Sequence, residues 1–579
     1  RECRAMVRPA GLEPATSDLG GGSSEVEVQD VPATEGHVQF AKLRSRPLLP
    51  PLISMSGIPM PPTISLLSVS LILALQPLLP GQREASEPTQ PNILFLLIDD
   101  MGWPDVGCYG HAFHETPVID SLARQGVRLS DFYAAAPVCS PTRSTIQSGQ
   151  YSARTAVTDF IPGHWRPFER LVVPPIEHHL QADVLTPGDA LQAAGYTTGY
   201  FGKWHLGVGA EHAPDQHGYQ VTERQLGPKF QESRGDKPRG PKSIDFLTDA
   251  ALWFIDEHQD GPFFLTVSHY AVHIPLEGNP VTTQKYRDKQ KPATGVNHPV
   301  YAAMTEDLDT SIGRLLAKLE ELKIADNTVV VFTSDNGGLR KIFTGAGEVV
   351  STNAPLRGEK GTLYEGGIRV PMIVRWPGVI PAGSLCAAPT TTADLLPTFC
   401  AMAKTELPGQ PIDGANLLPL LREPSAELNR SSIYFHYPHY HHSRPAGAIR
   451  TGPWKLVEYF DTGELELFHL GEDLGETQNL VEKQPGRAEK MQGELTDWRK
   501  ATGARMPTVN AKHDPERASQ SGGDRLPLPC AVGRWLGSQL LRVRRQRRSI
   551  DPGAVAPRYV GQCCSVPRRT TAGDAEQRE

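Results

Sequence analysis

The chain has 579 residues, of which 39% are apolar and 7% aromatic, and this composition excludes a wholly disordered protein. Its length predicts two folded units with additional tails. The formal net charge of -7, from 65 acidic and 58 basic side chains, gives no reason to expect a nucleic-acid partner. None of the eight cysteines forms a Cys-x-x-Cys pair, which argues against a thiolate zinc site. Cys386 and Cys400 form either a disulfide or two buried thiols.

The two ends of the chain differ in composition from the rest. Residues 1–54 are rich in Gly, Pro, Ser and charge and indicate a disordered or non-native leader. Residues 55–90 hold an apolar run at 64–75, which predicts a signal peptide and a linker, and hence export to a periplasmic, extracellular or lysosomal-type compartment. The run is shorter than the roughly 20 residues that span a bilayer, so we expect no stable membrane span; an uncleaved anchor or a buried helix is the alternative. Residues 518–579 carry an arginine-rich run and are expected to form a disordered basic tail.

Between residues 91 and 430, apolar runs alternate with amphipathic segments. The runs that predict strands buried on both faces lie at 92–98, 262–268, 328–333 and 370–375. The segments that predict helices lie at 117–125, 187–194, 244–258 and 301–323. Strands that alternate with helices in this way predict an α/β domain with a large mixed, mostly parallel sheet flanked by helices.

From residue 431 to residue 517 the pattern changes. Short strand candidates at 448–450, 454–458 and 465–469 precede one amphipathic segment at 485–500. We expect this region to form a smaller C-terminal α+β subdomain.

Three of the predicted strands end in polar residues. Because ligands of open α/β sheets bind beyond the carboxyl ends of the strands, we expect these residues to converge. They are Asp99, Asp100, His269, His273, Asp335 and Asn336. Carboxylate and amide oxygens suit Ca²⁺ or Mg²⁺, so the pattern predicts a site for a hard cation. The alternative is that each aspartate caps a following turn.

The segment 136–146 predicts the start of a helix. Ser140 is a favoured N-cap and Pro141 fits the first turn, which would place Cys139 at the positive end of the helix with Arg143 one turn in. Such a position attracts an anion and lowers the pKa of a thiol. These features alone leave open whether Cys139 is a nucleophile or a structural residue.

The same segment, Cys139-Ser-Pro-Thr-Arg143, resembles the Cys-x-Pro-x-Arg signature of the type I, formylglycine-dependent sulfatases, an arylsulfatase-like family of the alkaline phosphatase superfamily. Residues 195–207 (GYTTGYFGKWHLG) resemble a second signature of that family, and four further pieces lie in the order that the family has, the first of them before both signatures. These pieces are Asp99-Asp100, His273 with Pro275, Ser334-Asp-Asn-Gly-Gly, and Arg357-Gly-Glu-Lys360. The resemblance extends into the C-terminal subdomain and covers about residues 90–515.

The resemblance implies a sulfatase, a sulfuric ester hydrolase that acts on a sulfated carbohydrate or an aryl sulfate. It implies that a maturation enzyme converts Cys139 to formylglycine, whose hydrate is the nucleophile, and that one divalent cation is bound, Ca²⁺ or else Mg²⁺. The implied metal ligands are Asp99, Asp100, Cys139, Asp335 and Asn336. The implied catalytic residues are Cys139, Arg143, Lys203, His205, His273 and Lys360.

The resemblance also implies a role for each catalytic group. Arg143 and Lys203 stabilise the charged diol. Lys360 and His273 neutralise the sulfate and protonate the leaving oxygen. His205 takes a proton from the second hydroxyl of the diol, so that sulfate leaves and the aldehyde returns.

Two features remain open to more than one interpretation. Gln147 departs from the family, which usually has a large aliphatic pair after its first signature, and puts a polar group where packing is usual. The loop at 160–179 and the histidine-rich stretch 436–442 are expected to shape the substrate pocket, although the stretch could also form a second metal site. The rival functions are a phosphoester or phosphonate hydrolase of the same superfamily and an unmatured polyanion-binding protein.

Overall fold

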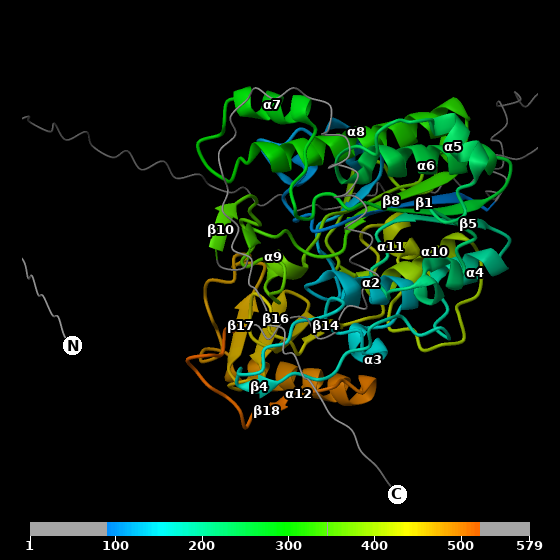
Figure 1. Ribbon diagram of the computed structural model, residues 1–579. Coiled ribbons are helices and arrows are strands. Elements are labelled where there is room, and N and C mark those ends of the chain that lie inside the picture. Colours follow the sequence, from blue (N-terminus) through cyan, green and yellow to red (C-terminus); the bar gives the residue numbers. More distant parts are fainter. Residues whose placement is uncertain (1–89, 344–345, 521–579) are drawn as a thin grey trace, which may run out of the picture. The chain divides into compact units, whose positions relative to one another are not determined.

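The structure is a computed structural model that describes residues 90–343 and 346–520 (Figure 1). Residues 1–89 and 521–579, which hold the predicted leader and export signal and almost all of the predicted tail, lie outside the described residues. Within the two described ranges, no helix combines the length and the apolar character needed to cross a membrane.

An eight-stranded sheet forms the centre of the larger part of the fold. In spatial order its strands are β12 (Ser384–Cys386), β2 (Val127–Leu129), β11 (Met372–Arg375), β8 (Thr328–Ser334), β1 (Asn92–Ile98), β7 (Phe263–Ser268), β5 (Thr197–Gly202) and β6 (Val221–Thr222). Every pairing is parallel except those of β11 with β2 and with β8. The predicted mixed, mostly parallel sheet is therefore confirmed.

Helices cover both faces of this sheet (Figure 1). On one face, side chains such as Leu94 and Leu96 of β1 pack with α1 (Pro117–Gln125), α6 (Ile244–Glu257) and α8 (Pro299–Glu321). On the other, Ile93 and Phe95 pack with α4 (Pro187–Ala193), α10 (Leu395–Met402) and α11 (Leu418–Arg422). Because successive side chains of a strand point to opposite faces, β1 must be apolar at nearly every position, which is the pattern that made it recognisable.

Strand β5 lies inside the 195–207 signature and was not predicted. A Cβ on its Gly199 would lie 2.7 Å from the ring of Phe254 on α6, so close packing of helix on strand requires a glycine there. Glycine also weakens the strand pattern in the sequence. Strands β2, β6 and β12 have only two or three residues and carry no pattern of their own.

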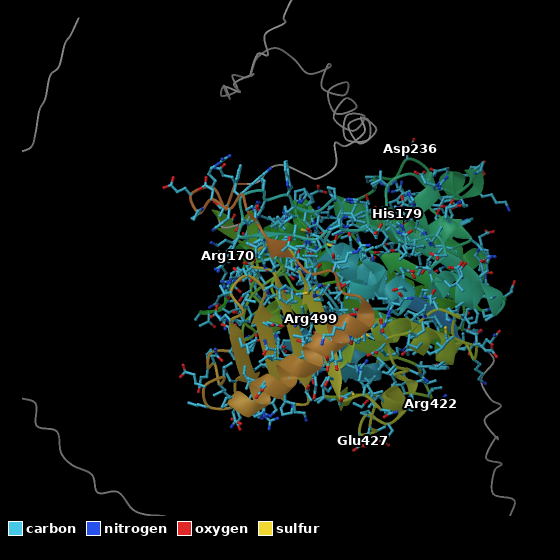
Figure 2. The ribbon with its side chains drawn as sticks, turned by 90° about the horizontal axis from the view of Figure 1, so that it is seen from below. Arg170, His179, Asp236, Arg422, Glu427 and Arg499 are labelled. Atoms are coloured by element: carbon cyan, nitrogen blue, oxygen red, sulfur yellow. The ribbon has the colours of Figure 1, made fainter. Side chains whose placement is uncertain are left out.

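The C-terminal region forms an antiparallel sheet in the order β14 (Ser432–Tyr437), β15 (Ala446–Thr451), β16 (Trp454–Tyr459) and β17 (Leu465–His469). Helix α12 (Pro485–Thr502) packs Leu495 against Leu456, and its Arg499 donates to Glu458 of β16 at 2.6 Å (Figure 2). On the opposite face of the sheet, Phe435 packs against Tyr133 of the larger part. The predicted α+β subdomain is confirmed, with β14 as an additional strand.

Short elements complete the described fold. The α-helices among them are α2 (Cys139–Ser148), α3 (Ser152–Thr155), α5 (Pro228–Arg234), α7 (Pro280–Asp288) and α9 (Glu365–Ile368), and the 3-10 helices are η1 (Gly107–Tyr109), η2 (Ala210–His212), η3 (Pro214–Gln216), η4 (Pro241–Ser243), η5 (Ala325–Asn327) and η6 (Thr392–Asp394). The paired strands are β3 (Phe132–Tyr133) with β13 (Thr390–Thr391), β4 (Leu171–Val172) with β18 (Thr508–Val509), and β9 (Lys341–Phe343) with β10 (Ala346–Val349). Cys386 and Cys400 are both free and buried, so the thiol interpretation is correct and the disulfide is wrong.

Candidate active site

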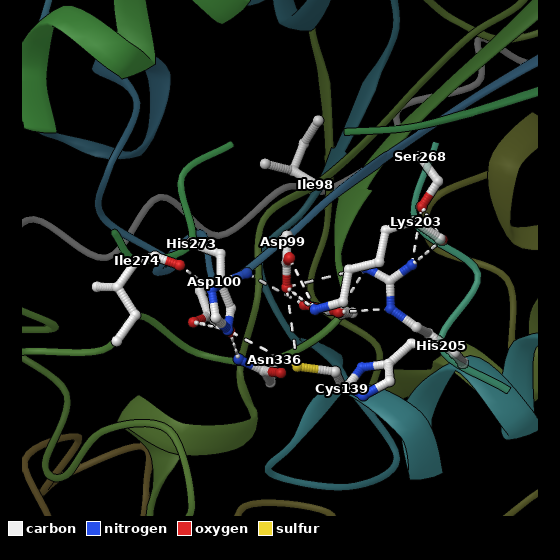
Figure 3. Close-up of polar contacts among 12 residues, drawn as sticks. Ile98, Asp99, Asp100, Cys139, Lys203, His205, Ser268, His273, Ile274 and Asn336 are labelled. Carbon is white, nitrogen blue, oxygen red and sulfur yellow. Dashed lines mark hydrogen bonds and ion pairs between the residues drawn. The ribbon is translucent and has the colours of Figure 1, made fainter. Parts of the chain in front are cut away.

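The ends of three neighbouring strands bring the predicted carboxylates together (Figure 3). The Asp335 amide after β8 donates to Ile98 at the end of β1 (3.0 Å), and the Asp99 amide donates to Ala271 beyond β7 (3.1 Å). Adjacent residues of a strand would point to opposite faces, but Asp100 has a φ of 62°, in the left-handed region. This turn aims both Asp99 and Asp100 into the same site.

Each of these carboxylates has a lysine or arginine as its nearest charged neighbour. Lys203 lies 2.7 Å from Asp99, Lys360 lies 2.7 Å from Asp100, and Arg143 lies 2.7 Å from Asp335. Burial by itself would raise the pKa of Asp99, but Lys203 and the other nearby cationic groups outweigh that effect and hold the pKa below its ordinary value. The carboxylates at 99 and 100 are therefore ionised and available as ligands.

Asn336 supplies an oxygen that nothing in the described chain satisfies. Its Nδ2 donates to Asp100 Oδ1 at 2.7 Å, while its Oδ1 is buried and has no hydrogen-bond partner. Leaving a buried acceptor unpaired is costly unless a ligand completes it. Together with three carboxylates, this oxygen forms a hard donor set that fits a divalent cation.

Cys139 lies at the first position of α2, beside these carboxylates. Its Sγ is 3.7 Å from Asp99 Oδ1 and 4.0 Å from Asp100 Oδ1, and Lys360 Nζ is 3.4 Å away. The N-cap is Val138 and makes no side-chain cap, so the prediction of Ser140 as N-cap is wrong. Ser140 Oγ instead accepts from the Ile161 amide at 3.1 Å, which ties the loop after residue 160 to the start of the helix.

The thiol of Cys139 is not activated. Burial raises its pKa to about 12, even though Lys203 and Lys360 lower it. The expectation of a lowered thiol pKa at the helix start is therefore wrong, because desolvation outweighs the helix dipole and the two ammonium groups. As a cysteine, residue 139 would be a poor nucleophile at neutral pH.

Two histidines border the nucleophile and the mouth of the site. The Nε2 of His205 lies 2.8 Å from the Ile161 carbonyl, which can only accept, so Nε2 carries the proton and Nδ1 is a free base. Burial lowers the pKa of His205 to about 3, which keeps the ring neutral. His273 is 31% exposed, directs Nδ1 to the Ile274 carbonyl at 2.5 Å and has Nε2 3.6 Å from Asp100.

Arg143 lies behind the carboxylates and is 1% exposed. Its Nε donates to Asp335 at 2.8 Å, and one of its terminal nitrogens donates both to the Lys203 carbonyl (2.6 Å) and to Ser268 Oγ (2.8 Å). Ser268 was missed from the sequence, although it ends a predicted strand as the aspartates do. The guanidinium therefore holds the backbone of Lys203 and the carboxylate of Asp335 in place.

The departure at Gln147 is accommodated by a hydrogen bond. Gln147 is 2% exposed, and its Oε1 accepts from the hydroxyl of buried Tyr219 at 2.9 Å. The polar side chain thus packs on α2 as part of a satisfied pair, and no reacting group is displaced.

The histidine-rich stretch divides into a strand and a loop. His436 belongs to β14, where it is buried and contacts the Arg505 carbonyl at 3.1 Å, so the expectation of a single pocket loop is wrong for this residue. His442 Nδ1 lies 2.6 Å from the Lys360 carbonyl, and His441 packs against Gly361. None of these histidines belongs to a potential metal-binding group within the described residues, whereas Asp99, Asp100, Cys139 and His273 form one.

The site combines a hard donor set for a divalent cation with three cationic side chains at the strand ends of an α/β sheet, and the relatives of the chain identify the family to which it belongs. Residues 91–405 match the family described as Sulfatase, and residues 358–501 match that described as N-sulphoglucosamine sulphohydrolase, C-terminal. A sulfatase of Formosa agariphila is 31% identical over 74% of this chain and 92% of its own length. The N-acetylgalactosamine-6-sulfatase of Sus scrofa is 31% identical over 82% of this chain and 89% of its own.

A solved structure gives the same result for the fold. Ps i-CgsB, in complex with k-i-k-neocarrahexaose, superposes with a TM-score of 0.60 at 26% identity and covers 80% of this chain and 100% of its own. The chain belongs to the sulfatase family, within the alkaline phosphatase superfamily. It is a sulfuric ester hydrolase, and the reaction it catalyses is the hydrolysis of a sulfate ester.

Proposed function

We propose that this sulfatase cleaves sulfated carbohydrates with residue 139 in the formylglycine form and with one bound divalent cation. The observation that carries the proposal is the position of Cys139. Its Sγ lies within 4.0 Å of two ionised carboxylates, one of which, Asp100, also accepts from the amide of Asn336, yet burial keeps the thiol protonated. A maturation enzyme that oxidises this residue would replace a poor nucleophile with a hydrated aldehyde.

The residues that would hold the cation are Asp99, Asp100, Asp335, Asn336 and residue 139. When bound, a divalent cation supplies positive charge that neutralises the sulfate and favours a deprotonated hydroxyl on residue 139. We favour Ca²⁺ because a site of several protein oxygens suits its high coordination number, whereas Mg²⁺ usually retains more of its water. Occupation of the carboxylates would release the ammonium groups of Lys203 and Lys360, which now face Asp99 and Asp100, toward the sulfate.

The proton transfers follow from the two histidine tautomers. The free Nδ1 of His205 is the base that takes a proton from a hydroxyl of residue 139. The Nδ1 of His273 donates to the Ile274 carbonyl, so the ring protonates the leaving oxygen through Nε2 in its doubly protonated form, from the exposed side of the site. Lys203 and Lys360 stabilise the charge that develops between them, and Arg143 keeps Lys203 and Asp335 in register.

Two observations support a carbohydrate substrate over a simple aryl sulfate. The solved relative at 26% identity is described in complex with an oligosaccharide. Beside Lys360, rings from two distant segments also gather: Phe160 lies 4.6 Å from His164, and His164 lies 5.0 Å from His441, which packs against Gly361. Such rings suit the faces of sugars. Export of the protein, expected from the segment before residue 90, would bring it to glycan substrates.

Mass spectrometry of the purified protein tests the proposed nucleophile. A peptide that contains residue 139 should be lighter by about 18 Da than the cysteine form, the difference between a thiol and an aldehyde side chain. A wholly unmodified cysteine in a preparation that retains full sulfatase activity would refute the proposal. Fully unmodified, inactive protein that still binds sulfated polymers would favour the polyanion-binding alternative.

A comparison of rates tests the substrate class. The matured protein should hydrolyse 4-nitrophenyl sulfate and a panel of sulfated mono- and oligosaccharides faster than 4-nitrophenyl phosphate or a phosphonate monoester, and removal of the cation by a chelator should abolish all of these rates. Faster turnover of the phosphorus esters would replace the proposal with its superfamily rival. Re-addition of Ca²⁺ and Mg²⁺ in separate samples identifies the preferred ion.

A further inference from the structure

Lys242 is a cation near the active site that none of the proposed steps uses. It lies in η4, immediately before α6, and its backbone is in the left-handed region with φ 51° and ψ 25°. The next residue, Ser243, is left-handed too, with φ 56° and ψ 20°. Two successive residues other than glycine rarely adopt this conformation, and where they do the surrounding structure must hold them.

Specific hydrogen bonds hold this turn against the active-site segment. The Lys242 amide donates to Glu277 Oε2 at 3.2 Å, and Glu277 follows His273 by four residues. On the other side, Arg239 Nε donates to Ser243 Oγ at 3.2 Å. The strained turn is therefore attached to the segment that carries His273, the partly exposed residue at the mouth of the site.

The ammonium group of Lys242 interacts electrostatically with the centre but is not one of its pairs. Glu277, Asp99 and Asp100 attract it and Lys203 repels it, while partial burial lowers its pKa below the ordinary value. Every carboxylate of the centre already has a cation at 2.7 Å, namely Lys203 for Asp99, Lys360 for Asp100 and Arg143 for Asp335. Among the described residues, the Lys242 ammonium forms no close ion pair, and Glu277 attracts it only from a longer distance. A half-buried cation without a partner is a ready binding site for an anion.

We propose that Lys242 binds a second anionic group, a sulfate or a carboxylate, on the same substrate whose sulfate ester is cleaved. The natural substrate then carries at least two negative charges, as a disulfated sugar or a sulfated sugar with a carboxylate does. This inference rests on the proposed function, because it assigns the chemistry of the group next to the scissile ester. The scissile sulfate itself is served by Lys203 and Lys360, which leaves Lys242 for its neighbour.

Competition against one reporter substrate tests this assignment. The experiment measures the inhibition constants of three ligands against the hydrolysis of 4-nitrophenyl sulfate. The ligands are N-acetylglucosamine 6-sulfate, glucosamine N,6-disulfate and iduronic acid 2-sulfate. We expect the wild-type protein to bind at least one of the two doubly charged ligands about tenfold more tightly than the singly charged one, as one charge-assisted contact provides. Glucosamine N,6-disulfate tests for a second sulfate, and iduronic acid 2-sulfate tests for a carboxylate.

Three variants connect that preference to the side chain. Lys242→Ala should remove the tenfold preference, Lys242→Arg should keep most of it, and Lys229→Ala, which deletes an exposed lysine of the nearby α5, should leave it intact. A wild-type protein without any preference for the doubly charged ligands would overturn the assignment. So would a Lys242→Ala variant that weakens the singly and doubly charged ligands equally, because Lys242 would then serve the scissile sulfate.

Failure of the proposed function can be told apart from failure of this inference. If the matured wild-type protein hydrolyses neither 4-nitrophenyl sulfate nor any of the sulfated saccharides, the proposed chemistry is wrong. Calorimetric titration of the same three ligands into the wild-type and Lys242→Ala proteins then still measures the preference directly. Equal affinities of the two proteins for the doubly charged ligands would reject the role of Lys242 by itself.

Discussion

Two buried groups of charges with similar ingredients serve different ends in this molecule. The strand-end cluster consists of three carboxylates and three cations at the active site, namely Asp99, Asp100, Asp335, Arg143, Lys203 and Lys360. The interface cluster consists of Lys455 of β16 with Glu365 at the start of α9 and Glu476, at 2.9 Å and 2.8 Å. Both clusters are almost fully buried, so burial of charge does not by itself mark a functional site.

The neighbours of each cluster account for the difference. The three interface residues are each 0% exposed, and Glu365 also accepts from the Tyr133 hydroxyl at 2.7 Å and pairs with Arg369 at 3.2 Å. Burial raises the pKa of Glu476 and also that of Asp335 in the strand-end cluster, so the direction of these shifts does not separate the two clusters. The strand-end cluster instead borders Cys139, an unpartnered amide oxygen and the partly exposed His273. The active site differs from the structural cluster in its exposure to solvent and in its unpartnered ligand atoms, more than in its charge.

Replacement of residue 139, the proposed nucleophile, should cause the largest loss of activity. Cys139→Ala should lower kcat/KM for sulfate esters by at least about 10⁴-fold, because no other group in the site can attack the ester. The thermal midpoint should stay close to that of the wild-type protein, since the strand-end ion pairs remain. Cys108→Ala, which removes a free thiol elsewhere, serves as the control and should keep its activity. Substantial turnover by Cys139→Ala would contradict the proposed nucleophile.

Replacement of Lys455 in the interface cluster should lower the stability of the protein and change its catalytic activity little. Lys455→Met leaves Glu365 and Glu476 buried without their shared cation, and we expect a loss of about 3–5 kcal/mol in the free energy of unfolding. Chemical denaturation measures this loss, with the exposed Lys490→Met as control. Activity per folded molecule should change far less than stability does. A variant of normal stability with a severely reduced kcat would show that the interface cluster belongs to the catalytic machinery.

Loss of the unpartnered amide oxygen of Asn336 should weaken cation binding, which is a smaller effect than the two described above. Asn336→Ala removes one predicted cation ligand without removing charge, and the affinity for the activating cation should fall by about 10–100-fold. Cation titrations of activity measure this shift, and excess cation should restore most of the rate. Asn297→Ala, outside the site, should leave the titration unchanged. If Asn336→Ala titrates like the wild-type protein, the oxygen is not a ligand.

The strands of the fold that could be predicted from the sequence are those in which most positions are apolar. Strands β1, β7 and β8 are buried on both faces, so their apolar runs are continuous and their ends could be located to within a residue or so. Because these strands are parallel, the aspartates that follow them had to meet at one edge of the sheet. The convergence of the candidate site was predictable for this reason.

The features that were missed depend on tertiary contacts. β5 needs a glycine at position 199 because the ring of Phe254 packs against it. β14 contains His436, which contacts the carbonyl of Arg505. Lys242 lies in a left-handed turn that no periodic pattern indicates. The high pKa of Cys139 was also out of reach, because the sequence shows the helix start but not the extent of desolvation around it.

Gln147 offers the finest test of how closely the site tolerates departures from its family. Gln147→Leu installs an aliphatic side chain, as the family resemblance implies for this position, but leaves the buried Tyr219 hydroxyl without its acceptor, so the free energy of unfolding should fall by about 1–3 kcal/mol. The double variant with Tyr219→Phe removes both partners and should recover most of the loss in a denaturation experiment. The start of α2, and with it residue 139, should keep its place, so catalysis per folded molecule should change little. If Gln147→Leu proves more stable than the wild-type protein, the hydrogen bond does not compensate for the polar side chain on α2, and packing alone decides which residue this helix prefers.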